Sequence, residues 1–237
     1  MKITGMELVG VRVNQWLDWV FVLVDTDAGI RGLGELAPGG KTPDCLAALR
    51  DLGASLVGRD PRQIEPFVHE RTRDQPERAH RLALSAVEQA LWDILGKSLG
   101  VPVYRLLGGA CREEIRLYAN INRVSRRPEE RTPEFFARNA VAAVAEGFDA
   151  VKLAPFDGMP GEIDRARDVA PGIAATEAVR KAVGPGVDLL IDCHSHFTVA
   201  GALDVADALR DLDLFWFEQP TPESDLAGLR RIKEQSG

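Results

Sequence analysis

The chain has 237 residues, of which 45% are hydrophobic, so it is long enough to bury a large core in one or two domains. A net charge of -7 and a pI near 5.2 argue against a general binder of nucleic acid, because that role needs a clustered basic surface. We expect no nucleic-acid partner.

Cysteine use and hydropathy argue against two further classes of protein. The three cysteines, Cys45, Cys111 and Cys193, are odd in number and far apart, which favours a reducing cytoplasm over a disulfide-linked secreted fold. The longest apolar run, from Trp19 to Val24, has the length of a strand and is too short to cross a membrane. We therefore expect neither a membrane anchor nor secretion.

The N-terminal part of the chain predicts a strand meander followed by helices. Three strands are expected at Ile3–Val13, Trp19–Asp25 and Arg31–Glu35, with a hairpin turn at Asp27–Gly29. From Pro43 to about Gly100 the apolar period becomes helical. The broad apolar stripe of the last helix consists of Ala83, Leu84, Val87, Ala90, Leu91, Ile94 and Leu95.

From Glu114 onwards, strands and helices alternate. The expected strands are Glu114–Ile121, Phe148–Pro155, Val187–Cys193 and Asp213–Glu218, and the expected helices are Thr132–Glu146, Gly172–Val183, Thr198–Leu212 and Ser224–Glu234. Strands that alternate with one-sided helices indicate crossover units and a parallel sheet. Both a doubly wound sheet and a (β/α)₈ barrel begin with this pattern.

Polar residues stand where these strands end. Asp192 and Glu218 close two successive strands, and Lys152 and His194 lie at the ends of the second and third. Carboxylates that neighbouring parallel strands bring to one rim suit Mg²⁺, which prefers oxygen ligands. The same residues could instead be solvated loop carboxylates or helix caps, and Lys152 an ordinary charge at a strand end.

Several motifs together resemble one family. They are Asp25–Glu35, Ala86–Lys97 with Pro102, Leu106–Gly109, Asp192, and Phe217–Pro220, and their order and spacing are similar to the enolase superfamily, mandelate racemase subgroup. The resemblance implies an α/β fold with an N-terminal α+β capping domain in residues 1–112. Residues 113–237 would be the first four β/α units of a modified (β/α)₈ barrel, which binds Mg²⁺ and removes the proton alpha to a carboxylate.

The resemblance also implies roles for single residues. Asp192 and Glu218 match two metal ligands, and Lys152 matches the first lysine of a Lys-x-Lys motif that contacts the substrate carboxylate. The second lysine is replaced by Ala154, which weakens the match to racemases and cycloisomerases that use a lysine base there. His194, placed on the face of Asp192 by strand alternation, resembles the general acid of sugar-acid dehydratases.

Three further expectations concern the substrate loop, the histidines and the length. Trp16 is either a lid over a sugar-acid substrate or ordinary core. His194 and His196 also form the His-x-His of zinc hydrolases, although no later histidine completes that set, and His196 could equally be plain surface.

Because the chain ends in the fourth unit, we expect a dehydratase whose other half is absent or supplied in trans, as a homo-oligomer or with a complementing half. The alternative is a non-catalytic remnant that self-associates.

Overall fold

The computed structural model describes residues 1–13, 18–37, 42–73, 77–122 and 128–236. The chain divides into two compact units, Met1–Glu113 and Glu114–Gly237, each with its own hydrophobic core. The first unit contains β1 (Ile3–Arg12), β2 (Asp18–Thr26), β3 (Arg31–Leu36), α1 (Pro43–Leu56), α2 (Ile64–Thr72), α3 (Arg78–Leu99) and α4 (Val103–Leu106).

The second unit alternates strands and helices along the chain. Its strands are β4 (Ala119–Asn120), β5 (Ala150–Leu153), β6 (Asp188–Asp192) and β7 (Leu214–Glu218), and its α-helices are α5 (Pro133–Ala145), α6 (Ala170–Val183), α7 (Val199–Ala208) and α8 (Leu226–Gln235). Short 3₁₀ turns occur at Pro128–Glu130, Ala166–Val169 and Arg210–Leu212.

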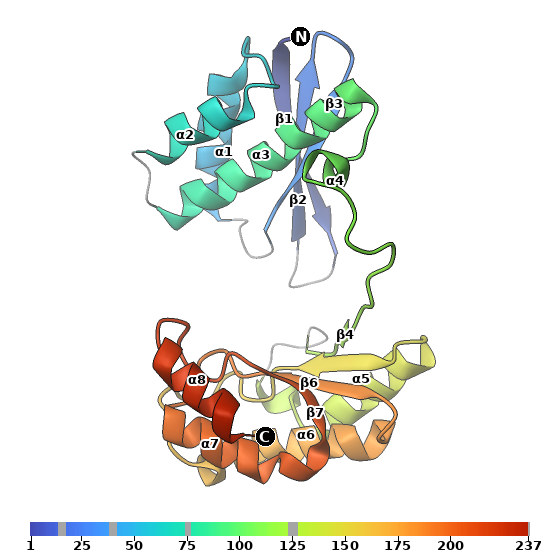
Figure 1. Ribbon diagram of the computed structural model, residues 1–237, viewed down its shortest axis with the longest axis vertical. Coiled ribbons are helices and arrows are strands. Elements are labelled where there is room, and N and C mark those ends of the chain that lie inside the picture. Colours follow the sequence, from blue (N-terminus) through green and yellow to red (C-terminus); the bar gives the residue numbers. More distant parts are fainter. Residues whose placement is uncertain (14–17, 38–41, 74–76, 123–127, 237) are drawn as a thin grey trace. The chain divides into compact units, whose positions relative to one another are not determined.

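The first unit is an antiparallel three-stranded sheet with helices packed against it. The strands follow the order β1-β2-β3, and the hairpin between β2 and β3 turns at Gly29, whose φ of 72° suits glycine. Helix α3 lies along the sheet with α1 beside it (Figure 1). The expected apolar stripe of α3 is buried apart from Leu95, which is partly buried, and the helix ends at Gly100 in the left-handed conformation.

Two glycines of β3 allow α3 to approach the sheet closely. A Cβ atom on Gly34 would lie 1.9 Å from the carbonyl oxygen of Ala86, and one on Gly32 would lie 2.1 Å from that of Ala90. Any side chain at these positions would push the helix away from the sheet. The Gly32-Leu33-Gly34 sequence is therefore a packing feature of the first unit.

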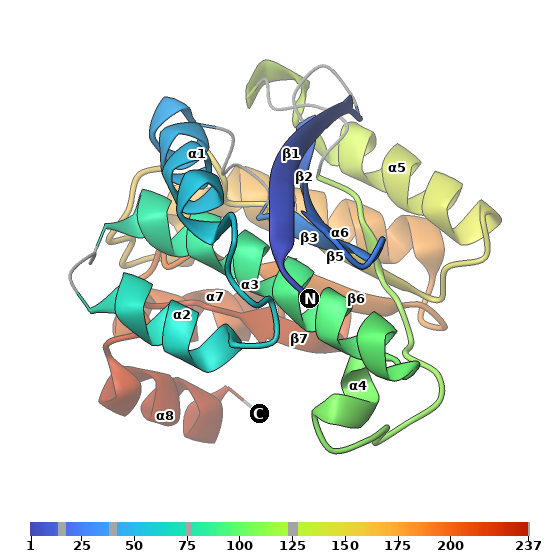
Figure 2. The same cartoon turned by 90° about the horizontal axis from the view of Figure 1, so that it is seen from above.

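The second unit is a parallel sheet with the order β4-β5-β6-β7. Helices α5, α6 and α7 cover one face of this sheet (Figure 1), and the helices of the unit follow one another in chain order (Figure 2). The core between sheet and helices includes Phe136, Val151, Leu153, Leu189 and Ile191, all fully buried. The parallel β/α organisation expected from the alternation is confirmed.

The first strand of this sheet is much shorter than expected. Only Ala119 and Asn120 pair with β5, whereas the sequence pattern predicted a strand over Glu114–Ile121. The preceding segment is exposed and is held by side-chain contacts, since Arg116 binds Asp149 at 3.0 Å and Asp188 at 2.5 Å. An edge strand gains ladder hydrogen bonds on one side only, so apolar content alone overestimated its length.

One irregularity lies between β6 and β7. Leu189 pairs with Leu214, but Leu190 pairs with Trp216, so Phe215 is an extra residue on β7. Because side chains alternate along a strand, one inserted residue reverses the face of everything that follows. The bulge thereby sets Glu218 directly beside Asp192 in the register.

Among the described residues, no helix has both the length and the apolar character that a membrane crossing requires.

Candidate active site

The carboxyl ends of β5, β6 and β7 bring three charged side chains together. The Nζ atom of Lys152 lies 2.9 Å from Oδ2 of Asp192 and 2.6 Å from Oε2 of Glu218. The side chains of Lys152 and Asp192 are only 8% and 10% exposed, whereas that of Glu218 is 32% exposed. The sequence expectation that these three residues meet at one rim of the sheet agrees with this arrangement.

The charged groups of this cluster favour one another's ionised forms. Burial disfavours the charged form of Asp192, but hydrogen bonds from Lys152 and from the His194 backbone outweigh it and lower the pKa of Asp192. Burial likewise opposes the ammonium of Lys152, yet its hydrogen bonds to Glu218 and Asp192 raise the pKa of Lys152. One buried ammonium is therefore shared between two carboxylates and balances the charge of only one of them.

A turn after β6, and not the alternation of side chains along a strand, places His194 beside Asp192. Strand β6 ends at Asp192, and His194 and Ser195 follow with φ values of 44° and 60°, a left-handed turn. The backbone N–H of His194 donates to Oδ1 of Asp192 at 3.2 Å, and ring Nε2 lies 3.2 Å from Oδ2 of the same residue. The expected proximity is present, but the turn produces it, and the expectation of a continuing strand is wrong.

Backbone hydrogen bonds continue between the two chain segments beyond the strand ends. The N–H groups of Cys193, Ser195 and Phe197 donate to the carbonyl oxygens of Glu218, Gln219 and Pro220 at 2.9, 2.8 and 3.0 Å. Non-glycine residues with positive φ are concentrated here, since Gln219 also has a φ of 45°. Such strained conformations persist where surrounding contacts hold them, often at functional sites.

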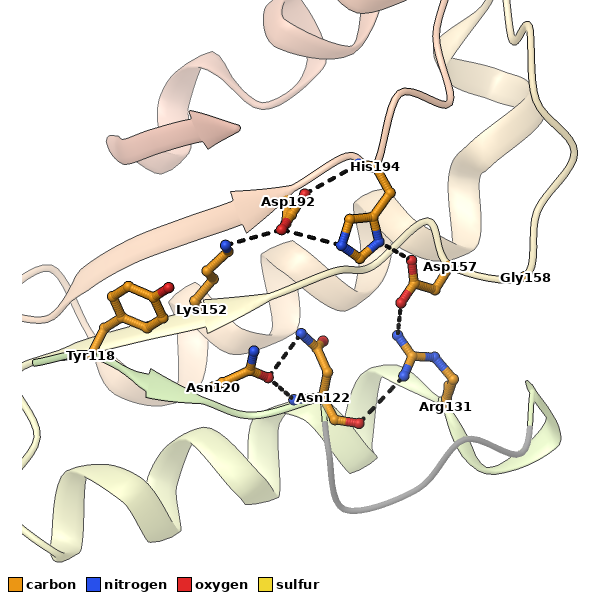
Figure 3. Close-up of a pocket in the computed structure, with 9 residues that line it drawn as sticks. All are labelled: Tyr118, Asn120, Asn122, Arg131, Lys152, Asp157, Gly158, Asp192 and His194. Atoms are coloured by element: carbon orange, nitrogen blue, oxygen red, sulfur yellow. Dashed lines mark hydrogen bonds and ion pairs between the residues drawn. The ribbon is translucent and has the colours of Figure 1, made fainter. Parts of the chain in front are cut away.

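An open cavity of about 490 Å³ lies over this rim (Figure 3). Polar side chains from β4, β5 and β6, from Tyr118 just before β4, and from the segments after these strands line it. They are Tyr118, Asn120, Asn122, Arg131, Lys152, Asp157, Asp192 and His194, together with Gly158. The size and the polar lining suit a small, hydroxyl-rich, anionic molecule.

Several lining residues were not found from the sequence. Asp157 accepts from His194, and Asn122 accepts from the Ala154 N–H at 2.6 Å while its own amide donates to Asn120. Arg131 donates to the Ala154 carbonyl at 2.7 Å. The Asp157-Gly158 turn directly after a buried strand was a usable signal, because loops at that end of a parallel sheet carry functional groups.

The remaining expected site residues have separate outcomes. Trp16 lies outside the described residues. His196 does not line the cavity, and its backbone pairs with Cys193 and Ile163. Ala154, which replaces the second lysine of the motif, is buried just past β5.

Burial and the charges of Asp192 and Glu218 raise the pKa of the Cys193 thiol, so this cysteine remains protonated beside the cluster.

The donor chemistry of the rim fits a hard divalent cation in part. Asp192 and Glu218 supply carboxylate oxygens that converge on a single positive charge, here the ammonium of Lys152. Mg²⁺ is commonly held by one or two carboxylates together with waters and substrate oxygens. Within the described part of the chain, no group of three or more His, Cys, Asp or Glu side chains could hold a metal ion, so this rim offers two carboxylates.

Two family descriptions match the two units. "Mandelate racemase / muconate lactonizing enzyme, N-terminal domain" matches residues 9–108, and "Enolase C-terminal domain-like" matches residues 136–237. Among solved structures, the mandelate racemase/muconate lactonizing enzyme from Jannaschia sp. CCS1 is similar over 99% of this chain and 65% of its own, with 31% identity and a TM-score of 0.81.

Similar proteins of named activity include two sugar-acid dehydratases. The D-gluconate dehydratase of Thermoproteus tenax is 32% identical over 92% of this chain, and the D-xylonate dehydratase of Haloferax volcanii is 34% identical over 93%. This chain spans about half the length of these relatives, 44% and 54% respectively. Matched in both units by sequence and over nearly its full length by structure, the chain belongs to the enolase superfamily, mandelate racemase subgroup.

Proposed function

We propose that this chain contributes the Lys152–Asp192–His194–Glu218 side of the active site of a Mg²⁺-dependent sugar-acid dehydratase, a carbon–oxygen lyase. Further polypeptide would supply the remaining groups, from the same protein or from a second one. The observation that carries the proposal is the His194 ring, held against Asp192 at the cavity, in a chain with Ala154 in place of the second lysine. The two dehydratases among the relatives support it.

Asp192 and Glu218 are the proposed protein ligands of the cation. When bound, Mg²⁺ supplies positive charge that stabilises the substrate carboxylate as its alpha proton leaves. Hydrogen bonds from Lys152 and from the His194 backbone lower the pKa of Asp192 against the opposing effect of burial, which favours the carboxylate form that a cation binds. The ammonium of Lys152, fixed at the same rim, is a donor for the substrate carboxylate.

His194 is the proposed general acid. In the elimination, a base supplied by the further polypeptide accepts the proton from the carbon alpha to the carboxylate, and the bond between the beta carbon and its hydroxyl oxygen breaks. Hydroxide is a poor leaving group, so a proton from His194 converts the departing oxygen to water. The enol that remains rearranges to a 2-keto-3-deoxy acid, and the net change is loss of one water.

The test is a comparison of His194→Asn with His196→Asn. Each variant is made in the complete protein, or is combined with a complementing C-terminal half, and is supplied with Mg²⁺ and a panel of sugar acids that includes D-gluconate, D-xylonate and D-galactonate. Formation of the 2-keto-3-deoxy acid is followed with a carbonyl reagent, and exchange of the alpha proton is followed in deuterated buffer. His194→Asn should lower dehydration by about 10²- to 10⁴-fold while exchange continues, and His196→Asn should change neither strongly.

Other outcomes identify the alternatives. Proton exchange without water loss in the unaltered protein would point to a racemase or cycloisomerase. Neither exchange nor dehydration with any acid, alone or with a complementing C-terminal half, would support the non-catalytic remnant. Equal loss of activity in both histidine variants would count against His194 as the acid.

A further inference from the structure

The His194 ring lies between two carboxylates. Its Nδ1 is 2.5 Å from Oδ1 of Asp157, and its Nε2 is 3.2 Å from Oδ2 of Asp192 (Figure 3). The two nitrogens stand on opposite sides of an imidazole, so the Asp157 contact decides which nitrogen faces Asp192 and the cavity. A neutral imidazole has one N–H only, and because the Asp157 contact is shorter than the Asp192 contact, 2.5 Å against 3.2 Å, that hydrogen is assigned to Nδ1.

Asp157 is itself held in place. It follows β5 in a turn, and its backbone N–H donates to the Ala154 carbonyl at 3.4 Å. Its Oδ2 lies 3.8 Å from the guanidinium of Arg131, whose side chain is only 10% exposed and also donates to the Ala154 carbonyl. The two carboxylate oxygens thus face two different partners, one of them a largely buried cation.

An ordinary surface ion pair would explain less. Exposed pairs contribute about 0–1 kcal/mol and rarely fix a geometry. Here both Asp157 and His194 line the cavity, and the backbone of His194 is in the left-handed region, which costs energy for a residue other than glycine. Contacts on both ring nitrogens favour this orientation of a side chain that is 46% exposed.

We propose that Asp157 is a positioning residue for His194: it accepts the Nδ1 hydrogen and thereby presents Nε2 to Asp192 and the substrate cavity. The role is that of carboxylates that orient an imidazole in hydrolases and metal sites. For the reaction, it makes Nε2 the nitrogen that passes a proton to the departing hydroxyl. That last consequence rests on the proposed dehydratase function, whereas the orientation of the ring does not.

The experiment compares Asp157→Ala and Asp157→Glu with the matched control Asp168→Asn. Asp168 is an exposed acid that pairs with its neighbour Arg167 and does not line the cavity. Nitrogen-15 NMR of histidine-labelled protein, with His194→Asn used to assign the signals, reports which ring nitrogen carries the hydrogen at alkaline pH. Melting temperatures confirm that each variant is folded.

In the unaltered protein and in Asp168→Asn, the hydrogen of neutral His194 should be on Nδ1. Asp157→Ala should shift it to Nε2, and Asp157→Glu should restore Nδ1 at least partly. If the protein dehydrates sugar acids, Asp157→Ala should lower kcat by about 10- to 100-fold with little change in KM. Unchanged His194 signals in Asp157→Ala would overturn the proposal, with or without activity.

The two proposals fail separately. The NMR result decides the orientation of His194 even when no sugar acid reacts. If Asp157→Ala shifts the hydrogen but the unaltered protein has no dehydratase activity, the positioning role stands and the proposed reaction does not.

Discussion

Lys152 is the residue on which the charge balance of the site depends. It is almost fully buried, and its ammonium contacts both Asp192 and Glu218. Tyr118 adds an aromatic face 5.5 Å from the same Nζ atom. Asp192 also contacts the His194 ring at 3.2 Å, but among the described residues Lys152 is the one lysine or arginine that pairs with either carboxylate. A divalent cation bound by Asp192 and Glu218, as proposed, would therefore act on the same pair of oxygens as Lys152.

This competition gives a prediction for Lys152→Met. The variant leaves two carboxylates without their cation, and breaking a buried ion pair costs about 3–5 kcal/mol of unfolding free energy. Added Mg²⁺ should recover part of that loss and should raise the melting temperature more in the variant than in the unaltered protein. Thermal unfolding with and without Mg²⁺ measures both effects.

Lys97→Met is the matched control, since Lys97 forms an exposed pair with Asp93 at 2.7 Å. It should cost less than about 1 kcal/mol and show no additional response to Mg²⁺. An equal response to Mg²⁺ in both variants would contradict a shared position for Lys152 and the cation.

At the residue scale, the sequence located the charged residues better than their partners. Lys152, Asp192 and Glu218 could be placed together because parallel strands end at one rim. Asp157 and Arg131 could not, because their contacts depend on turn geometry after β5 that no periodicity encodes. The left-handed turn at His194 was likewise absent from a reading based on alternation.

At the element scale, the bulge on β7 has the largest effect on the site. With the Leu189–Leu214 register continued unbroken, Asp192 would pair with Phe217, and Glu218 would lie on the opposite face. The extra residue Phe215 corrects this. The sequence motif Phe217–Pro220 placed Glu218 at the end of a strand, but the register that makes Glu218 a neighbour of Asp192 is a property of strand pairing in three dimensions.

The contact between β3 and α3 gives a second prediction. In Gly34→Ala the new Cβ atom would lie 1.9 Å from the carbonyl oxygen of Ala86. This is too close for a contact between the two atoms, so the helix or the strand must move. We expect a loss of about 1–3 kcal/mol in the unfolding free energy of the first unit. Chemical denaturation followed by circular dichroism measures it.

Gly10→Ala is the control, because Gly10 is exposed on β1 and a Cβ there meets nothing within 4 Å. It should be neutral or slightly stabilising, as alanine loses less conformational entropy than glycine in a strand. Equal losses in both variants would mean that glycine flexibility matters at β3 and close packing does not.

At the scale of the whole molecule, the edge strands β4 and β7 of the second unit pair with no further strand among the described residues, and exposed apolar side chains lie beside them. Phe215 and Trp216 on β7 are 61% and 45% exposed, and Ile115 and Leu117 before β4 are 74% and 66% exposed. Unpaired edges with apolar neighbours favour association with further polypeptide. This surface agrees with the proposal that other strands complete the site.

The open edge predicts concentration-dependent self-association of this chain. Phe215→Glu should weaken it by about 10-fold or more, because a charge would replace apolar contact area at the edge. Leu226→Glu is the control, since Leu226 is 74% exposed but lies on α8. Sedimentation equilibrium measures the dissociation constants, and a monomer at all concentrations would contradict the prediction.

The backbone ladder between Cys193–Phe197 and Glu218–Pro220 has a consequence for measurement. Three amides donate across it, at Cys193, Ser195 and Phe197, so their hydrogens exchange with solvent only when the two segments separate. Slow exchange at these amides would report that the spacing of Asp192 and Glu218 is fixed before any ligand arrives. A ligand that binds on this side of the cavity would then lose little free energy to ordering of the backbone. The side-chain rotamers of Asp192 and Glu218 would be what still has to be fixed, and they would decide which cations fit.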